Sequence, residues 1–106
     1  MFDFLIETLT RNGKGIHAYR ACAEQGYTAA ADRPDAAAAM FLLARIAEAF
    51  ADINERMPIT ATDVDSAFAR FGDHVQRLNA AWNDGTEAAR LAALNHVAGE
   101  MAQDAA

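Results

Sequence analysis

The sequence contains very little cysteine and lysine, and each scarcity excludes a class of protein. Cys22 is the one cysteine, so an intramolecular disulfide is impossible and a reducing, cytoplasmic location is expected. Lysine occurs once, at position 14, and the nine basic residues stand singly among 15 acidic ones, which leaves a net charge of −6. Because a phosphate backbone requires clustered basic side chains, direct nucleic-acid binding is not expected.

Long apolar runs are also lacking. The longest, residues 36–44, ends at Arg45, whereas a helix that spans a bilayer needs about 20 apolar residues. The first nine residues include no basic side chain, so they do not have the pattern of a secretory signal. The sequence therefore predicts a protein that has no membrane segment.

Alanine, the strongest helix former, is abundant, and apolar residues recur three and four positions apart. Two prolines and short polar links divide the chain into segments 2–31, 35–57, 62–82 and 84–105. Thr62 is expected to cap the third segment, and Asp84 or Thr86 the fourth. Amphipathic helices joined by short links form antiparallel bundles. We therefore expect an all-α protein, an antiparallel four-helix bundle that forms one domain over residues 1–106.

The first segment contains Asn12-Gly13-Lys14-Gly15, although its apolar spacing continues through these residues. Each glycine costs about 1 kcal/mol relative to alanine inside a helix. Asn-Gly is also a frequent end of a helix. The sequence thus leaves two possibilities open, a kink or break at residues 12–15 and one unbroken helix.

The second segment organises the chain, because its apolar seam has no gap. The seam of the fourth segment comprises Leu91, Leu94, Ala98, Met101 and Ala105. In the second segment the seam comprises Ala36, Ala39, Leu43, Ile46, Phe50, Ile53 and Met57. The side chains expected to be most buried in the whole bundle are Leu43, Ile46, Phe50, Phe68, Phe71, Val75, Leu78 and Leu94.

Several large apolar residues do not fit these seams. Phe41 falls almost opposite the seam of the second segment, and Phe4 falls outside the seam of the first. One bundle does not easily cover the far side of a helix, so we expect a surface patch that binds a second copy or another protein. Cover by the N-terminal segment is the other possibility. The residues expected in the interface are Phe4, Ile6, Met40, Phe41 and Leu42.

Acidic residues share an outward face of the second segment. Glu48, Asp52 and Glu55 lie close enough in sequence to Arg45 and Arg56 to form ion pairs along a helix. A solvated face of such pairs is the ordinary interpretation. The sharper hypothesis is an acidic docking face for a basic protein partner.

Motifs typical of catalytic, metal or cofactor sites are few. His17 and His96 are expected to face outward and His74 to lie at the edge of a seam. No glutamate lies three residues before a histidine, so the Glu-x-x-His pattern of di-iron bundles is missing. We therefore expect neither a metal site nor a cofactor, and no enzymatic activity.

These observations favour a small acidic helical protein that acts by binding another protein, as a regulator, inhibitor or adaptor. A phage- or plasmid-type inhibitor of a basic enzyme is one concrete version. The alternative is a bundle that binds a small apolar ligand in its core, beside Tyr19, Tyr27 and Trp82. A lesser alternative is a phosphotransfer-type bundle that uses an exposed histidine.

Overall fold

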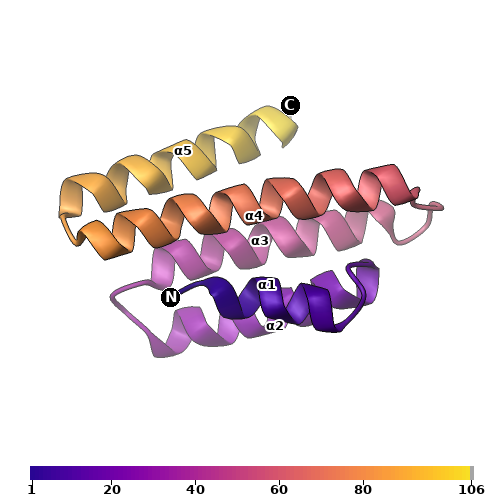
Figure 1. Ribbon diagram of the computed structural model, residues 1–106, viewed down its shortest axis with the longest axis horizontal. Coiled ribbons are helices and arrows are strands. Elements are labelled where there is room, and N and C mark those ends of the chain that lie inside the picture. The colour runs from indigo at the N-terminus through magenta and orange to yellow at the C-terminus, as the bar shows by residue number, and fades with distance from the viewer. Residues whose placement is uncertain (106) are drawn as a thin grey trace.

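The protein is all-helical over residues 1–105, the part of the chain that the computed structural model describes. Five helices follow one another without a strand in this range (Figure 1). They are α1 (Asp3–Arg11), α2 (Ile16–Asp32), α3 (Ala37–Asn54), α4 (Ala61–Asp84) and α5 (Glu87–Ala105). The expected helical class is confirmed, and the packing is compatible with a bundle, but the number of helices is five and not four.

The fifth helix arises from a break at residues 12–15. Gly13 and Lys14 both adopt positive φ angles, 87° and 64°, which end α1 and reverse the chain. Residues other than glycine and asparagine rarely adopt this backbone conformation, so the backbone of Lys14 is locally strained. Of the two possibilities that the sequence left open, the structure has the break, and α1 folds back against α2.

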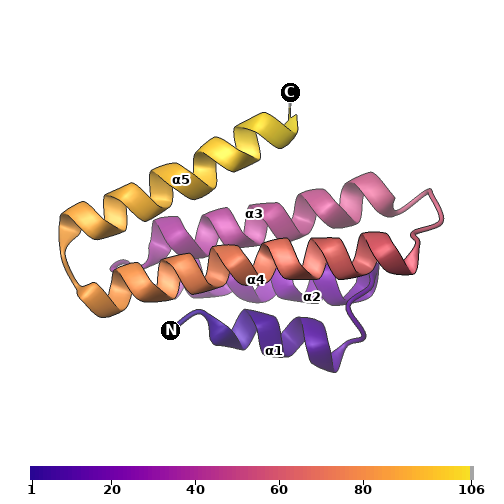
Figure 2. The same cartoon turned by 45° about the horizontal axis from the view of Figure 1, so that its top comes forward.

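The helices lie in layers around α3. Figure 1 shows α1 and α2 on one side of α3, and α4 and α5 on the other. Turning the molecule shows α5 leaving α4 progressively towards its C-terminal end (Figure 2). As a result, α3 is covered on more than one face.

Short polar links end and begin the helices by recognisable capping. Thr60, and not Thr62 as expected, caps α4, because its hydroxyl accepts a hydrogen bond from the Asp63 amide at 3.1 Å. Gly85 ends the same helix with φ 80°. The Thr86 hydroxyl accepts from the Ala89 amide at 3.2 Å, so of the two predicted caps for α5 the structure uses threonine.

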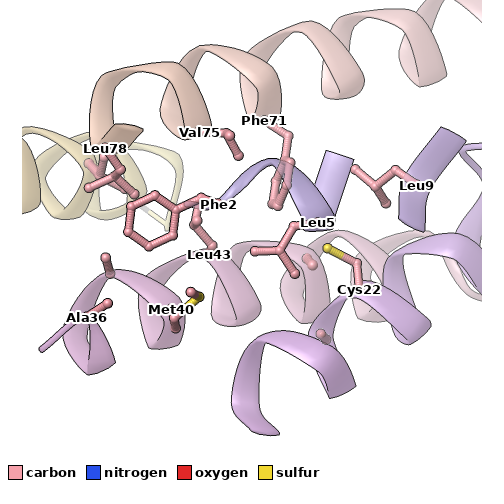
Figure 3. Packing of buried hydrophobic residues seen from close by; sticks show 14 of the residues in the cluster. Phe2, Leu5, Leu9, Cys22, Ala36, Met40, Leu43, Phe71, Val75 and Leu78 are labelled. Atoms are coloured by element: carbon pink, nitrogen blue, oxygen red, sulfur yellow. The ribbon is translucent and has the colours of Figure 1, made fainter. Parts of the chain in front are cut away.

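Half of the side chains expected to be most buried are so: Leu43, Phe71, Val75 and Leu78. Figure 3 shows these four pointing into a common interior, together with Leu5 and Leu9 from α1 and with Phe2, which precedes α1. The prediction is wrong for Ile46, Phe50, Phe68 and Leu94, which are only partly buried.

The buried stripe of α3 is rotated from the predicted seam and consists largely of small residues. Ala44, Ala47 and Ala51 are fully buried, whereas Ile53 is 71% exposed. The reason is the close approach of α2, where a Cβ added at Gly26 would lie 2.8 Å from the Ala44 Cβ. Small residues allow this approach, so α3 turns its alanines towards α2.

The seam of α5 is also displaced from the prediction. Ala93 and Val97 are its buried residues, and Leu91 is mostly exposed. Leu94 and Met101 are partly buried. Because α5 packs on α4 at one end and leaves it at the other, only a narrow stripe of α5 reaches the core.

Candidate binding surfaces

Phe41 is the centre of an exposed apolar patch. Its side chain is 52% exposed, and its ring lies 5.5 Å from the ring of Tyr27 on α2. Beside it is an open hollow of about 640 Å³ that Leu42, Leu94 and Asn95 line with alanines from α2, α3 and α5. None of the residues lining this hollow is charged. We call this surface the Phe41 patch.

The predicted interface does not form one surface. Met40 is fully buried, so its assignment to an interface is wrong; α3 is covered on two sides, and Met40 points into the core (Figure 3). Phe4 and Ile6 pack partly buried against the core, and Phe4 lines a separate hollow between α1 and α2. Of the five predicted residues, Phe41 and Leu42 lie together on the Phe41 patch.

The acidic face of α3 is occupied by arginines. Arg20 on α2 donates to Asp52 at 3.2 Å and to Glu55 at 2.5 Å, and Arg45 donates to Glu48 at 2.8 Å. All of these side chains are about half exposed, so each pair contributes little, on the order of 0–1 kcal/mol. The arrangement is a solvated network that ties α2 to α3, and its carboxylates already have cationic partners.

A second hollow, which we call the Phe50 cleft, lies where α5 diverges from α3 and α4. Its volume is about 680 Å³. Its apolar lining comprises Ile46, Phe50 and Ile53 from α3, Phe71 from α4 and Met101 from α5. Three members of the predicted seam of α3 therefore line a cleft, although a seam of this kind is normally covered by another helix.

Tyr19 also lines the Phe50 cleft. Its ring is 1% exposed, lies 4.2 Å from the Phe50 ring and meets the Phe71 ring edge-on. Its hydroxyl has no hydrogen-bond partner among the described residues. Burying a hydroxyl without a partner costs about 1–3 kcal/mol. Burial and the nearby Cys22 raise the pKa of Tyr19, so the hydroxyl keeps its proton.

The predicted alternative was a ligand site lined by Tyr19, Tyr27 and Trp82, and one of these three residues lines the Phe50 cleft. Tyr19 lines the Phe50 cleft, whereas Tyr27 lines the hollow of the Phe41 patch. Trp82 lines neither, because its ring packs edge-on against Phe2 and its indole NH donates to the Asp35 carbonyl. The three aromatic residues named from the sequence therefore lie at three different places in the fold.

Two histidines converge on one glutamate between α4 and α5. His74 Nε2 lies 3.5 Å from Glu100, and His96 Nε2 lies 2.9 Å from the other oxygen of the same carboxylate. His74 is 6% exposed, and desolvation lowers its pKa, with the nearby Glu100 carboxylate opposing the shift. His17 and His96 are exposed, as expected. Residues 1–105 hold no group of three side chains that could ligate a metal ion.

The single cysteine lies in the core and not on a reactive surface. Cys22 is fully buried on α2 (Figure 3). Burial raises the pKa of its thiol to about 12. Because the thiolate is the nucleophilic form, this side chain acts as a small apolar residue.

Sequence reasoning missed the Phe50 cleft. The exposure of Ile53 follows from the direction that α5 takes, which no local pattern encodes, whereas Met57, 66% exposed, lies beyond the end of α3 at Asn54. The available signal was a mismatch of length. The predicted seam of the second segment has seven members and runs to Met57, whereas that of the fourth segment has five.

Comparison with known proteins adds no relative. No family model, curated protein or solved structure matches this chain. Within residues 1–105, no helix has both the length and the apolarity that crossing a membrane requires. The functional argument therefore depends on the surfaces described above.

Proposed function

We propose that this chain acts by binding protein, and that its first partner is a second copy of itself. The observation that carries the proposal is the Phe41 patch, where a half-exposed phenylalanine ring stands beside an uncharged hollow. Burying a large apolar side chain contributes about 1.5–3 kcal/mol, so leaving Phe41 in water forgoes part of that free energy.

A second copy suits this patch because an exposed ring and an uncharged hollow lie side by side on it. In a two-fold contact the same surface meets on both chains, so each Phe41 ring would enter the hollow beside the other. The hollow has an alanine-rich lining, which leaves space for an aromatic ring. An uncharged surface also suits two chains that each carry a net charge of −6, because no like charges meet at the centre of the contact.

A regulator, inhibitor or adaptor in a reducing, cytoplasmic setting is the biological form that we propose for such a dimer. The net charge favours a basic protein as a further partner. The carboxylates of Asp52 and Glu55 already bind Arg20, so a basic partner on that face would have to displace this arginine. The Phe41 patch has no such competitor.

The test is the oligomeric state of wild type beside Phe41→Glu, measured by light scattering over a wide concentration range. Wild type should form dimers as its concentration rises, and Phe41→Glu should stay monomeric with an unchanged helical circular-dichroism spectrum. Met57→Glu is the matched control, since it adds the same charge at an exposed apolar residue that lines neither the Phe41 hollow nor the Phe50 cleft. A wild type that remains monomeric, or a Phe41→Glu variant that unfolds, would contradict the proposal.

A further inference from the structure

The Phe50 cleft is enclosed to a degree that suits a small molecule. Four helices contribute to its lining, since Tyr19 from α2 joins residues of α3, α4 and α5. Its volume of about 680 Å³ lies within the roughly 300–1,000 Å³ that small-molecule sites occupy. Such sites are mostly apolar and hold a few polar groups that orient the ligand.

Among the side chains that line this cleft, Tyr19 has a buried polar atom without a hydrogen-bond partner. The side chain is almost completely buried, and its hydroxyl lacks a hydrogen-bond partner among residues 1–105. Buried polar groups nearly always have a partner in native proteins. A ligand with one hydrogen-bonding group would provide it, since a neutral hydroxyl can both donate and accept.

The charged residues around the cleft are already paired. Arg70 pairs with Asp104, both of which line the cleft, and Arg45 pairs with Glu48 at 2.8 Å. His74 faces Glu100 at 3.5 Å. A charged ligand would therefore have to give up its hydration without gaining a free counter-charge, which disfavours it.

We propose that the Phe50 cleft binds a small uncharged molecule that has an apolar body and one hydrogen-bonding group, which the Tyr19 hydroxyl binds. The site is separate from the Phe41 patch, because the residues that line the two hollows do not overlap. Failure of either proposal therefore leaves the other intact.

The probe for this proposal is 1-octanol, with octanoate as the charged molecule of the same chain length. Binding is followed by amide chemical shifts in NMR titrations of the full chain. 1-Octanol should shift the resonances of Phe50, Phe71 and Met101 in a saturable way. Octanoate should bind at least tenfold more weakly, because the cleft offers it no free cation.

Two variants locate the binding. Tyr19→Phe should weaken 1-octanol binding about fivefold, which corresponds to the loss of one neutral hydrogen bond. The same variant should unfold at the same urea concentration as wild type or at a higher one, because it removes an unpartnered hydroxyl. A purely structural role for Tyr19 would instead lower stability and leave the affinity unchanged.

Ala67→Trp should abolish binding, because Ala67 lines the cleft and the indole would fill it. Ala69→Trp is its matched control, two residues along α4 at an exposed position outside the cleft, and it should bind 1-octanol as wild type does. The proposal is overturned if 1-octanol causes no saturable shifts, or if Ala67→Trp binds it normally. It is equally overturned if Ala67→Trp only changes the oligomeric state, which would make the cleft a contact between copies.

Discussion

At the scale of single residues, the contact between α2 and α3 depends on a missing methyl group. Gly26 lies where a Cβ would meet the Ala44 Cβ at 2.8 Å and its Cα at 3.2 Å, closer than carbon atoms pack. Glycine is unfavourable inside a helix, so its presence in the middle of α2 trades helix propensity for close packing.

Gly26→Ala should therefore destabilise the protein by about 1–2 kcal/mol, because overpacking costs about 1–3 kcal/mol and the gain in helix propensity returns only part of it. Gly72→Ala on α4 is the matched control. No atom lies within 4 Å of the Cβ that it adds, so it should stabilise by about 0.5–1 kcal/mol. Urea unfolding of both variants tests the pair, and a stabilising Gly26→Ala would show that α2 and α3 lie further apart.

Burial, and not residue type, should rank the phenylalanines of α4. Phe71 is 1% exposed in the core, whereas Phe68 is only partly buried, with the Lys14 ammonium 4.0 Å above its ring. Phe71→Ala should cost about 3–5 kcal/mol in urea unfolding, the usual price of a fully buried phenylalanine. Phe68→Ala should cost clearly less, and equal losses would mean that the two rings are buried alike.

At the scale of helices, the sequence predicts where most helices lie better than how they are rotated. The glycines made a break after Arg11 one of two possibilities, and the apolar spacing of α4 predicted the burial of Phe71, Val75 and Leu78. The rotation of α3 is missed because a hydrophobic pattern weights large side chains and ignores the choice of alanine as a packing surface. The buried alanines at 44, 47 and 51, of which Ala44 packs against Gly26, were the overlooked signal.

Of the candidate surfaces, the Phe41 patch was partly predicted from the sequence and the Phe50 cleft was not. Phe41 is found from the sequence because a single large residue opposite a seam is visible in the pattern. Met40 is misplaced because the pattern does not show that α3 is covered from two sides. The Phe50 cleft depends on the angle at which α5 leaves α4 (Figure 2), and the angle between two helices follows from how their side chains pack. Sequence spacing describes one helix at a time, so it does not report that angle.

The contact between α4 and α5 at His74 should make the stability of the folded protein depend on pH. His74 faces Glu100, with His96, Arg70 and Asp73 nearby, and desolvation lowers its pKa below the ordinary value near 6.5. The unfolded chain therefore binds the proton more tightly than the folded chain. The contribution of neutral His74 to the free energy of unfolding should be fully present above pH 6.5. It should be lost as the pH falls below 6.5 towards the lower pKa of His74 in the folded chain.

Urea unfolding at pH 7.5, 6.5 and 5.5 measures this loss. His74→Gln should flatten the dependence over that range, whereas His17→Gln, at an exposed position of α2, should keep the wild-type slope. A wild type that becomes more stable on acidification would mean that the Glu100 carboxylate outweighs desolvation at His74.

At the scale of the whole molecule, charge and apolar surface are distributed so that two modes of association respond oppositely to salt. The chain carries a net charge of −6, whereas the residues lining the Phe41 hollow are uncharged. Two copies that meet at the Phe41 patch repel each other only through charges elsewhere on their surfaces. A basic partner on the acidic face of α3 would be attracted through direct ion pairs.

Added salt screens both effects, since the screening length falls from about 30 Å at 0.01 M to about 10 Å at 0.1 M ionic strength. Self-association through the Phe41 patch should therefore tighten severalfold between 0.01 M and 0.3 M sodium chloride in sedimentation measurements. Phe41→Glu should stay monomeric throughout, because screening does not remove the cost of burying a carboxylate. A dimer that weakens as salt rises would instead be held by ion pairs, which would move the contact from the Phe41 patch to the carboxylates and arginines of α2 and α3.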